Sequence, residues 1–501
     1  MPARPPNRRQ FLAAIALGAA PLAACTRASS TKSGSLNAAI QSTERARPHT
    51  GRTRSVTLTP QPRTLDIGGR QVQTWSYGPT VPAQVIRANI GDELAVMVAN
   101  RLPEPTSVHW HGIALRNDMD GVTPASGNLP AGSDFTYRFS VPDSGSYWFH
   151  PHVGVQADYG LYGALIVDDP AAAAAYDLEW IVVLDDWTDG VGPRPRQILS
   201  SLRSSGMSGM GSGSMSGMSG GSMSGMSSKV GSSALLGGDA GDVKYPMYLI
   251  NGRTDPAPDV LRAKPGQRVR LRIINAGADT AFRVGLGGHR LTVTHTDGYP
   301  VTPRTVDALL LGMGERYDAI LTLGDGVFPL VAQAEGKSAS TRALVRTSAG
   351  TLPDTAATPA ELHRQIGTAA LFSATRAVRL PTRTPDTVLT ARLGGDMASY
   401  VWTINGKTYT DTVPLMVQQG QRVRLNIDNQ SMMWHPMHLH GHTFQLVTPA
   451  GTGPRKDTTI VLPMQSMSVD FQADNPGTWM LHCHNAYHAE AGMMTRLQYR
   501  T

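Results

Sequence analysis

The sequence predicts an all-β protein built from three Greek-key β-sandwich domains, and three observations support this. The chain has 501 residues, whereas a single hydrophobic core stops growing at roughly 250–300 residues. Short Val/Leu/Ile runs are punctuated by 52 glycines and 35 prolines, which is typical of strands joined by turns. One strand-like segment also recurs three times, which indicates a duplicated domain.

The recurring segment alternates apolar and polar residues, the period of a half-buried strand. Each copy places a glycine nine residues before an asparagine. The copies are Val85–Asn100, Val260–Asn275 and Pro414–Asn429, with glycines Gly91, Gly266 and Gly420. They lie a whole domain apart, which excludes a solenoid.

The repeats place the domain boundaries. We expect domain 1 at residues 51–170, domain 2 at 171–350 and domain 3 at 370–501, with a Pro/Thr/Ala-rich linker at 351–369. A second segment, Phe139–His152, aligns without a gap with Phe471–His484. Domains 1 and 3 are therefore expected to share a feature that domain 2 lacks.

Residues 1–24 are predicted to be an export leader. The RRQFL at residues 8–12 resembles a twin-arginine signal, and the apolar stretch after it is shorter than the roughly 20 residues of a membrane span. The LAAC ending at Cys25 resembles a bacterial lipobox, which predicts a lipid on Cys25 and anchoring at the outer face of the cytoplasmic membrane. Residues 25–50 then form a tether. The alternative is a plain cleaved signal.

Charge and cysteine content narrow the function classes. The formal net charge is +7, but three of the basic residues lie in the leader and no basic cluster stands out in the rest. The sequence therefore shows no basic patch of the kind by which proteins bind nucleic acid. The chain has two cysteines, Cys25 and Cys483, and each has a better explanation than a disulfide between them.

Four His-x-His pairs occur at equivalent places in domains 1 and 3. Residues i and i+2 of a strand point to the same face, so four such pairs can converge at one interface, and imidazole is a suitable copper ligand. The pairs are His109/His111, His150/His152, His438/His440 and His482/His484. Domain 2 holds Val284 and Leu286 at the positions of the first pair, so it is interpreted as a spacer without ligands.

Domain 3 adds the pattern H…C-x4-H-x4-M at His435, Cys483, His488 and Met493. Two imidazoles, a thiolate and a weak thioether are the ligands of a blue-copper electron-transfer site. Domain 1 has Pro151 in place of Cys483, so one such site is expected. Cys483 also lies between His482 and His484, which gives a short covalent path between the two kinds of site.

These segments, HWHG, HPH, HPMHLHGH and HCHNAYHAEAGM, resemble the four signature segments of the multicopper oxidases. The resemblance spans residues from about 50 to 501 and is closest to bacterial, in particular actinobacterial, copper-resistance lipoprotein oxidases. It implies cupredoxin-like domains, O2 as electron acceptor and four copper ions: one type 1, one type 2 and a type 3 pair. The implied ligands are His435, Cys483, His488 and Met493 for type 1, His109 and His438 for type 2, and His111, His150, His152, His440, His482 and His484 for type 3.

The family also uses acids to deliver protons to the oxygen that is reduced. Asp120 matches one such position and is favoured over its neighbour Asp118. Many relatives carry a glutamate directly after the second type 1 histidine, but this chain has Ala489 there and Glu490 one residue later. Glu490 is therefore the candidate for a second proton path, alongside Cys483 and Asp120 as catalytic residues.

A Met-rich insert points to the electron donor. Residues 206–228 consist entirely of Gly, Ser and Met, a composition that predicts disorder, and thioethers select Cu(I). We expect Cu(I) capture near the type 1 site; the alternative is a tolerated low-complexity loop. Met432 and Met433, just before His435, are a second candidate, with strand packing as the alternative. The insert methionines are Met207, Met210, Met215, Met218, Met223 and Met226.

The leading hypothesis is thus a Cu(I) oxidase for copper tolerance. A laccase-like oxidase of phenols or a ferroxidase is the second, and a non-enzymatic copper-binding scaffold is the weakest, because the ligand set is intact. Related cuprous oxidases often have an acid four residues before the first type 1 histidine, where this chain has Ser431. The remaining histidines are interpreted as structural or hydrogen-bonding groups or as residues of the tether and the linker, and Asp457 and Asp470 as surface or hydrogen-bonding carboxylates and not as catalytic ones. A monomer is favoured.

Overall fold

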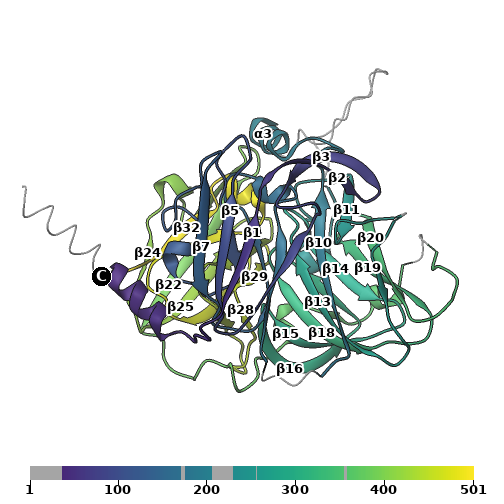
Figure 1. The fold of residues 1–501 in the computed structure, drawn as a ribbon. Helices are drawn as coiled ribbons and strands as arrows, with labels where there is room; N and C mark the ends of the chain where they lie inside the picture. Colours follow the sequence, from purple (N-terminus) through teal and green to yellow (C-terminus); the bar gives the residue numbers. More distant parts are fainter. Residues whose placement is uncertain (1–35, 171–174, 206–229, 256, 355–357, 501) are drawn as a thin grey trace, which may run out of the picture.

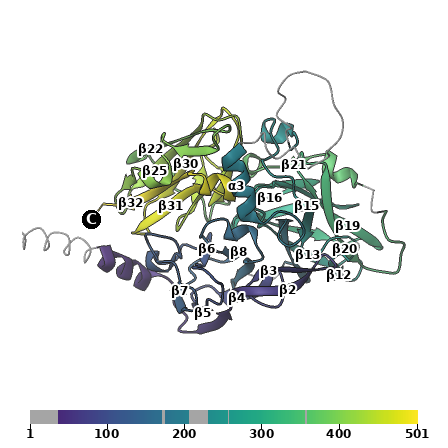
Figure 2. The same cartoon turned by 90° about the horizontal axis from the view of Figure 1, so that it is seen from above.

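The computed structural model describes residues 36–170, 175–205, 230–255, 257–354 and 358–500. Its strands fall into three groups that follow each other along the chain, and each group forms two main sheets, with an additional two-stranded sheet in domain 1. Figures 1 and 2 show the three domains gathered around a common centre, with domain 1 in purple and blue, domain 2 in teal and domain 3 in green and yellow. This is the three-domain, cupredoxin-like β-sandwich architecture that the sequence predicts.

Domain 1 contains a three-stranded sheet in the order β1-β5-β7, a four-stranded sheet in the order β4-β9-β8-β6, and the hairpin β2-β3. A helix over residues 36–46 precedes it. The strands are β1 (Thr53–Leu58), β2 (Gln61–Ile67), β3 (Arg70–Ser76), β4 (Ala83–Asn89), β5 (Glu93–Ala99), β6 (His109–His111), β7 (Asp134–Ser140), β8 (Gly145–His150) and β9 (Gly163–Asp168).

Domain 2 contains two six-stranded sheets, in the orders β11-β10-β13-β18-β15-β16 and β12-β20-β19-β14-β17-β21. Its strands are β10 (Leu178–Trp187), β11 (Met247–Ile250), β12 (Val260–Arg262), β13 (Arg268–Asn275), β14 (Phe282–Leu286), β15 (Leu291–Thr296), β16 (Tyr299–Val306), β17 (Ala308–Leu311), β18 (Arg316–Thr322), β19 (Val327–Ala334), β20 (Ala339–Arg346) and β21 (Ile366–Gly367). Helix α3 (Pro195–Ser205) follows β10. Because β21 pairs with β17, part of the expected linker is built into this domain.

Domain 3 contains sheets in the orders β23-β22-β25-β30-β27-β28 and β24-β32-β31-β26-β29. Its strands are β22 (Thr387–Asp396), β23 (Val401–Ile404), β24 (Leu415–Val417), β25 (Arg422–Asn429), β26 (His435–Leu439), β27 (Phe444–Leu446), β28 (Arg455–Lys456), β29 (Thr458–Val461), β30 (Ser466–Gln472), β31 (Thr478–Cys483) and β32 (Met494–Tyr499). The short helix α4 (Ala486–Glu490) joins β31 to β32.

The sequence repeat corresponds to one structural unit used three times. Its second strand (β5, β13 or β25) pairs in parallel with the first long strand of its domain and antiparallel with a later one. The conserved offset from glycine to asparagine then has a local reason. Each glycine has a positive φ that suits a turn, and each buried asparagine amide donates to a carbonyl of the loop that follows.

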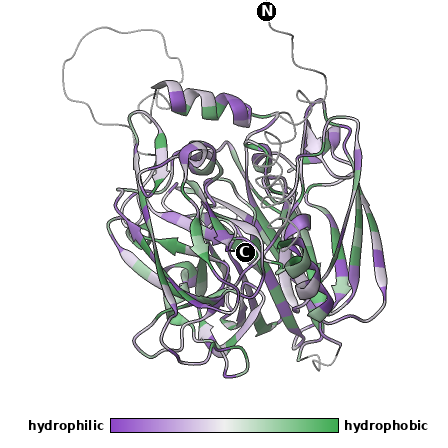
Figure 3. Cartoon of the chain, turned by 90° about the vertical axis from the view of Figure 1, so that its left-hand side faces the viewer, coloured by the Kyte–Doolittle hydropathy of each residue, from purple (hydrophilic) through white to green (hydrophobic). Residues whose placement is uncertain are grey.

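Burial follows the alternation of the strands, which are banded by hydropathy in Figure 3. A hydrophobic cluster continues through all three domains, and the β2-β3 hairpin of domain 1 packs on domain 2. These shared clusters join the domains through their cores, which allows a site to be built between them.

Among the described residues, no helix is both long and apolar enough to cross a membrane.

Candidate metal centre

The four His-x-His pairs meet between domains 1 and 3. In domain 1, β6 and β8 are neighbours with His109 opposite His150; in domain 3, β26 and β31 are neighbours with His438 opposite His482. The second histidine of each pair lies two residues further along the chain, at the end of the same strand or just beyond it. Across the interface the rings stack in a reciprocal pattern, His109 on His440 at 3.7 Å between centroids and His111 on His438 at 3.8 Å.

The ligand atoms of these histidines form three groups, and within each group all atoms lie within 4.8 Å of one another. Seven of the eight side chains are buried, and His152 is partly exposed. The groups are His109/His111/His438, His111/His150/His484 and His152/His440/His482. The second and third groups divide the six expected type 3 ligands into two sets of three, and the first contains both expected type 2 ligands.

The ring nitrogens that face the centre fit copper. The Nε2 atoms of His109, His150 and His438 are buried without a hydrogen-bond partner among the described residues, a costly arrangement unless a metal takes the lone pair. Their Nδ1–H groups donate to the carbonyls of Asp120, Pro151 and Asp457. Such bonds fix the tautomer that leaves Nε2 free for a metal. In His111 the unpartnered atom is Nδ1 instead.

Burial favours the neutral form of six of the imidazoles in the cluster, and this is the form in which an imidazole binds copper. Loss of hydration lowers the pKa of His111, His150, His440, His482 and His484 well below the usual value, and it lowers the pKa of His152 to about 3. The neighbouring histidines add to this effect, because two charged rings in contact would repel each other.

Two carboxylates lie against the histidine cluster. Asp120 accepts a hydrogen bond from His440 Nδ1 at 3.0 Å and lies 3.2 Å from His109 Nδ1, whereas Asp118 points outward and pairs with Arg116. Asp457 lies 3.1 Å from His111 Nε2 and 3.4 Å from His438 Nδ1. Although burial alone would raise the pKa of Asp457, its contacts with Arg316 hold that pKa well below the usual value.

The second site lies in domain 3. His435, Cys483 and His488 bring their ligand atoms within 4.8 Å of one another, with Cys483 Sγ 3.6 Å from His435 Nδ1 and 3.7 Å from His488 Nδ1. All three side chains are fully buried. This is the fit that a metal bound by two imidazoles and a thiolate requires.

The two neighbouring methionines have different environments. Met493 is fully buried in the same hydrophobic cluster as Cys483, and its carbonyl accepts from the Cys483 amide. Met494 belongs to a separate cluster with Val122, Met480 and Ala489. Of the two, Met493 is therefore the one on the side of Cys483.

Each candidate type 1 histidine has a different partner on its outer nitrogen. His435 Nε2 lies 2.8 Å from Ser431 Oγ, four residues before it in the chain. His488 Nε2 lies 2.8 Å from Asp242 Oδ2, in domain 2. Sequence reasoning did not find Asp242, because nothing in its surroundings signals a contact with a residue 246 positions away.

The remaining predicted residues lie as follows. Glu490 is partly buried and makes no hydrogen bond or ion pair with the candidate ligands in the described part of the chain; its carbonyl accepts from Arg203. Met432 is 69% exposed, whereas Met433 is 1% exposed and packs in the core, which favours strand packing for Met433. Met464, 65% exposed, is a third methionine near this site. Cys25 and the insert methionines lie outside the described residues.

One expectation is narrowed and one needs correction. Asp457 is fully buried beside the histidines and accepts hydrogen bonds from Arg316, so it is the hydrogen-bonding group and not the surface group of the two alternatives, while Asp470 forms an ion pair with Arg424. Domain 2 is more than a spacer, since it supplies Arg316 and Asp242 to the surroundings of the two sites. Its Gly314 also approaches so closely that a Cβ there would lie 2.9 Å from His111 and 3.0 Å from His484.

Comparison with known proteins gives a consistent result. Three family models described as multicopper oxidase match residues 60–172, 179–351 and 382–501. The chain is 55% identical to the multicopper oxidase MmcO of Mycobacterium tuberculosis over 98% of this chain and 96% of the relative. It is 26% identical to copper resistance protein A of Escherichia coli, covering 87% of this chain and 90% of the relative. Among solved structures, a laccase from Botrytis aclada aligns with a TM-score of 0.73 and 26% identity, over 91% of this chain and 89% of the other.

Proposed function

Since the chain belongs to the multicopper oxidase family, we propose that it couples the one-electron oxidation of a reducing substrate, foremost Cu(I) to Cu(II), to the four-electron reduction of O2 to water, and so serves copper tolerance. The observation that carries this proposal is the convergence of eight histidines, seven of them buried and several with unpartnered nitrogens, at one end of a strand whose Cys483 belongs to a second site. The ligand assignment is the one that the family motifs imply. When bound, the copper ions would supply the redox chemistry.

The residues of the chain have distinct tasks in this proposal. The carbonyls of Asp120, Pro151 and Asp457 orient the imidazoles. Cys483 is one peptide bond from His482 and from His484, so the backbone itself links the two sites. Asp120 holds a carboxyl group at His440 Nδ1, where it can pass a proton toward the cluster. Burial of the histidines excludes bulk water from the ring nitrogens.

Features near the type 1 site favour Cu(I) as the donor. One stem of the Met-rich insert lies beside this site, because Arg203 at the end of α3 donates to the Glu490 carbonyl of α4; the segment after the insert continues along the chain to Asp242. Met432 and Met464 expose their thioethers beside Ser431, whose carbonyl accepts from the Met464 amide at 3.2 Å. Soft sulfur ligands at the surface suit Cu(I). The relatives named copper resistance protein A agree with this direction.

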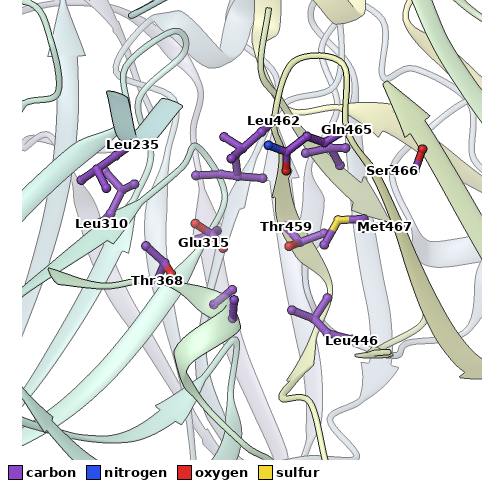
Figure 4. Close-up of a pocket in the computed structure, with 14 residues that line it drawn as sticks. Leu235, Leu310, Glu315, Thr368, Leu446, Thr459, Leu462, Gln465, Ser466 and Met467 are labelled. Atoms are coloured by element: carbon purple, nitrogen blue, oxygen red, sulfur yellow. The ribbon is translucent and has the colours of Figure 1, made fainter. Parts of the chain in front are cut away.

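One observation favours a laccase-like activity as the second candidate. A largely apolar cavity of about 220 Å³ lies at the interface between domains 2 and 3 (Figure 4). It is lined by Leu235, Leu462 and Met467 among others, and by Val461, which is the sheet partner of His435. A cavity of this kind could hold an aromatic ring near the type 1 site. The complete set of candidate ligands argues against the third hypothesis, a non-enzymatic copper-binding scaffold.

The test compares oxygen uptake with Cu(I), Fe(II) and a dimethoxyphenol for the wild type and for a variant without residues 206–228. We expect the deletion to lower Cu(I) turnover about tenfold or more, while phenol oxidation stays the same or rises. A matched control keeps the length of the insert and replaces its six methionines by serine; it should behave like the deletion. If each substrate is oxidised at the same rate by the wild type, the deletion variant and the serine variant, the proposed role of the insert is contradicted.

A further inference from the structure

The contact between His488 and Asp242 joins two domains at the type 1 site. Asp242 lies in the loop before β11 of domain 2, and His488 lies in α4 of domain 3. Asp242 Oδ2 is 2.8 Å from His488 Nε2 and accepts a second hydrogen bond from Tyr400 at 2.5 Å. All three residues are buried. Something must hold the loop and the helix in register for this contact to form.

Asp279, in the loop between β13 and β14, contacts both of them. On one side its carboxylate accepts from the backbone amides of Asp242, at 3.1 Å, and Val243, at 2.9 Å. On the other side its Oδ1 accepts from Asn485 Nδ2 at 2.7 Å. One buried carboxylate therefore bridges the loop that carries Asp242 and the residue that begins α4.

Asn485 passes this constraint on to His488. Its side-chain oxygen accepts from the amides of Tyr487 and His488 at 3.0 and 3.2 Å, so it is the N-cap of α4. The adjacent amide of Ala486 donates to the carbonyl of Ala278, the neighbour of Asp279, at 2.9 Å. The first turn of α4 is thus attached to the domain 2 loop by both a side chain and the backbone.

Lys337 makes this arrangement electrostatically stable. Its ammonium group lies 2.6 Å from Asp279 Oδ2 and also donates to the carbonyls of Val243 and Asp279 and to Thr280 Oγ1. Both charged side chains are fully buried, where an unpaired charge would be very costly.

The Asp242 loop is shaped to lie on this ion pair. A Cβ on Gly241 would come within 2.6 Å of Asp279 Oδ2 and 3.1 Å of Lys337 Nζ, and its φ of +129° favours glycine. Beneath the pair, Asp186 accepts from the amides of Ala278 and Asp279, which fixes the Asp279 loop itself.

We propose that Asp279, paired with Lys337, is a positioning residue of the type 1 site: it fixes α4 and the Asp242 loop relative to each other and thereby sets the hydrogen bond between Asp242 and His488. The domain without copper ligands would in this way control the geometry of a ligand in domain 3. The significance of this device rests on the proposed function, because it takes His488 to be a copper ligand.

The first test uses the full-length, copper-free protein and hydrogen–deuterium exchange. In Asp279→Asn the amide places a donor toward the amides and the ammonium that now donate to it. We expect exchange in residues 239–243 and in 485–490 to rise together, on the order of tenfold. The matched control is Asp318→Asn, which breaks another buried ion pair of domain 2, with Arg270 and Arg272, and should leave both segments unchanged.

A second variant separates the two sides of the bridge. Asn485→Ser keeps an N-cap residue and removes only the contact with Asp279, so exchange should rise in 485–490 and not in 239–243. It also decides the matter should Asp279→Asn not fold. Unchanged exchange of residues 485–490 in folded Asn485→Ser, or of both segments in folded Asp279→Asn, would overturn the proposal.

The copper-loaded protein gives an independent reading. Asp279→Asn should shift the absorption band and the electron paramagnetic resonance parameters of the type 1 copper, and Asp318→Asn should not; identical spectra for Asp279→Asn and wild type would count against a positioning role. If the wild type itself shows no type 1 signal after copper loading, the proposed function fails, and the exchange experiment still decides whether Asp279 holds the two segments.

Discussion

At the scale of single residues, Asp118 and Asp120 show what the motif could and could not predict. The spacing from His109 places both acids near the site, and the family resemblance favours Asp120. The structure gives the physical reason: a single 3-10 turn over Asn117–Met119 turns Asp118 outward to Arg116, while Asp120 is 1% exposed against His440. The two acids therefore form a natural pair for a test.

We predict that Asp120→Asn slows the reduction of O2 by about 10²–10⁴-fold, the usual range for loss of a proton-transfer group. The amide still accepts from His440 but cannot release a proton. Anaerobic bleaching of the blue band by substrate should be unchanged, while its return on mixing with O2 should be slow in stopped-flow absorption. Asp118→Asn is the control and should match the wild type. Equal rates of reoxidation in both variants would exclude Asp120 from proton delivery.

Other residues near the sites could not be found from the sequence. Asp242 and Asp457 contact histidines 246 and 346 positions away, and neither stands in a motif with a ligand. These contacts depend on the packing of domain 3 against domain 2 for Asp242 and against domain 1 for Asp457, which local patterns do not encode. A weak signal exists for Asp457, because a Lys-Asp-Thr-Thr segment that leads into an apolar strand puts a charged pair where the chain enters the core.

At the scale of elements, the sequence predicts well wherever the strand period and the repeat act together. The His-x-His pairs fall on or at the ends of β6, β8, β26 and β31, so that alternation alone places each pair on one face. The sequence does not predict that helix α4 makes contacts between domains. In the structure, both ends of this helix and its middle contact another domain. Its Tyr487 donates to Asp158 of domain 1, which also accepts from Tyr245 of domain 2.

This junction predicts a pH dependence of stability. Burial and the nearby Asp186 raise the pKa of Asp158 well above the usual value, so between the unfolded-state carboxyl pKa of about 3.9 and the folded-state pKa, folding takes up a proton that the unfolded chain does not hold. The stabilisation is present at low pH and is lost as the pH rises above about 4 toward the folded-state pKa.

Asp158→Asn removes this titration. We expect the variant to gain stability relative to the wild type as the pH is raised from 5 to 8, by about 1 kcal/mol or more, in thermal or chemical unfolding of the copper-free protein. Asp92→Asn, at an acid with a lowered pKa in domain 1, should show no such gain. A difference between Asp158→Asn and wild type that is the same at pH 5 and pH 8 would contradict this assignment.

At the scale of the whole molecule, the division of labour between the domains is the central result. The repeat predicts that domains 1 and 3 carry the ligands, and the structure brings their histidines together at one interface. The interpretation of domain 2 as a spacer was incomplete, because it supplies Arg316, Asp242 and the Asp279–Lys337 pair. A domain can lose its ligands and still be required, since the contacts it makes with its neighbours are not recorded in the ligand motifs.

The central claim is that two kinds of copper site share Cys483 and its neighbouring histidines. Its most direct test is the copper content and visible spectrum of the wild type and of Cys483→Ser, both fully loaded and checked for folding by circular dichroism. We predict about four copper ions and a blue thiolate band near roughly 600 nm for the wild type, and about three ions without the band or oxygen uptake for the variant. A variant that keeps the band or O2-coupled turnover, or a wild type that binds copper without the band, would contradict the account.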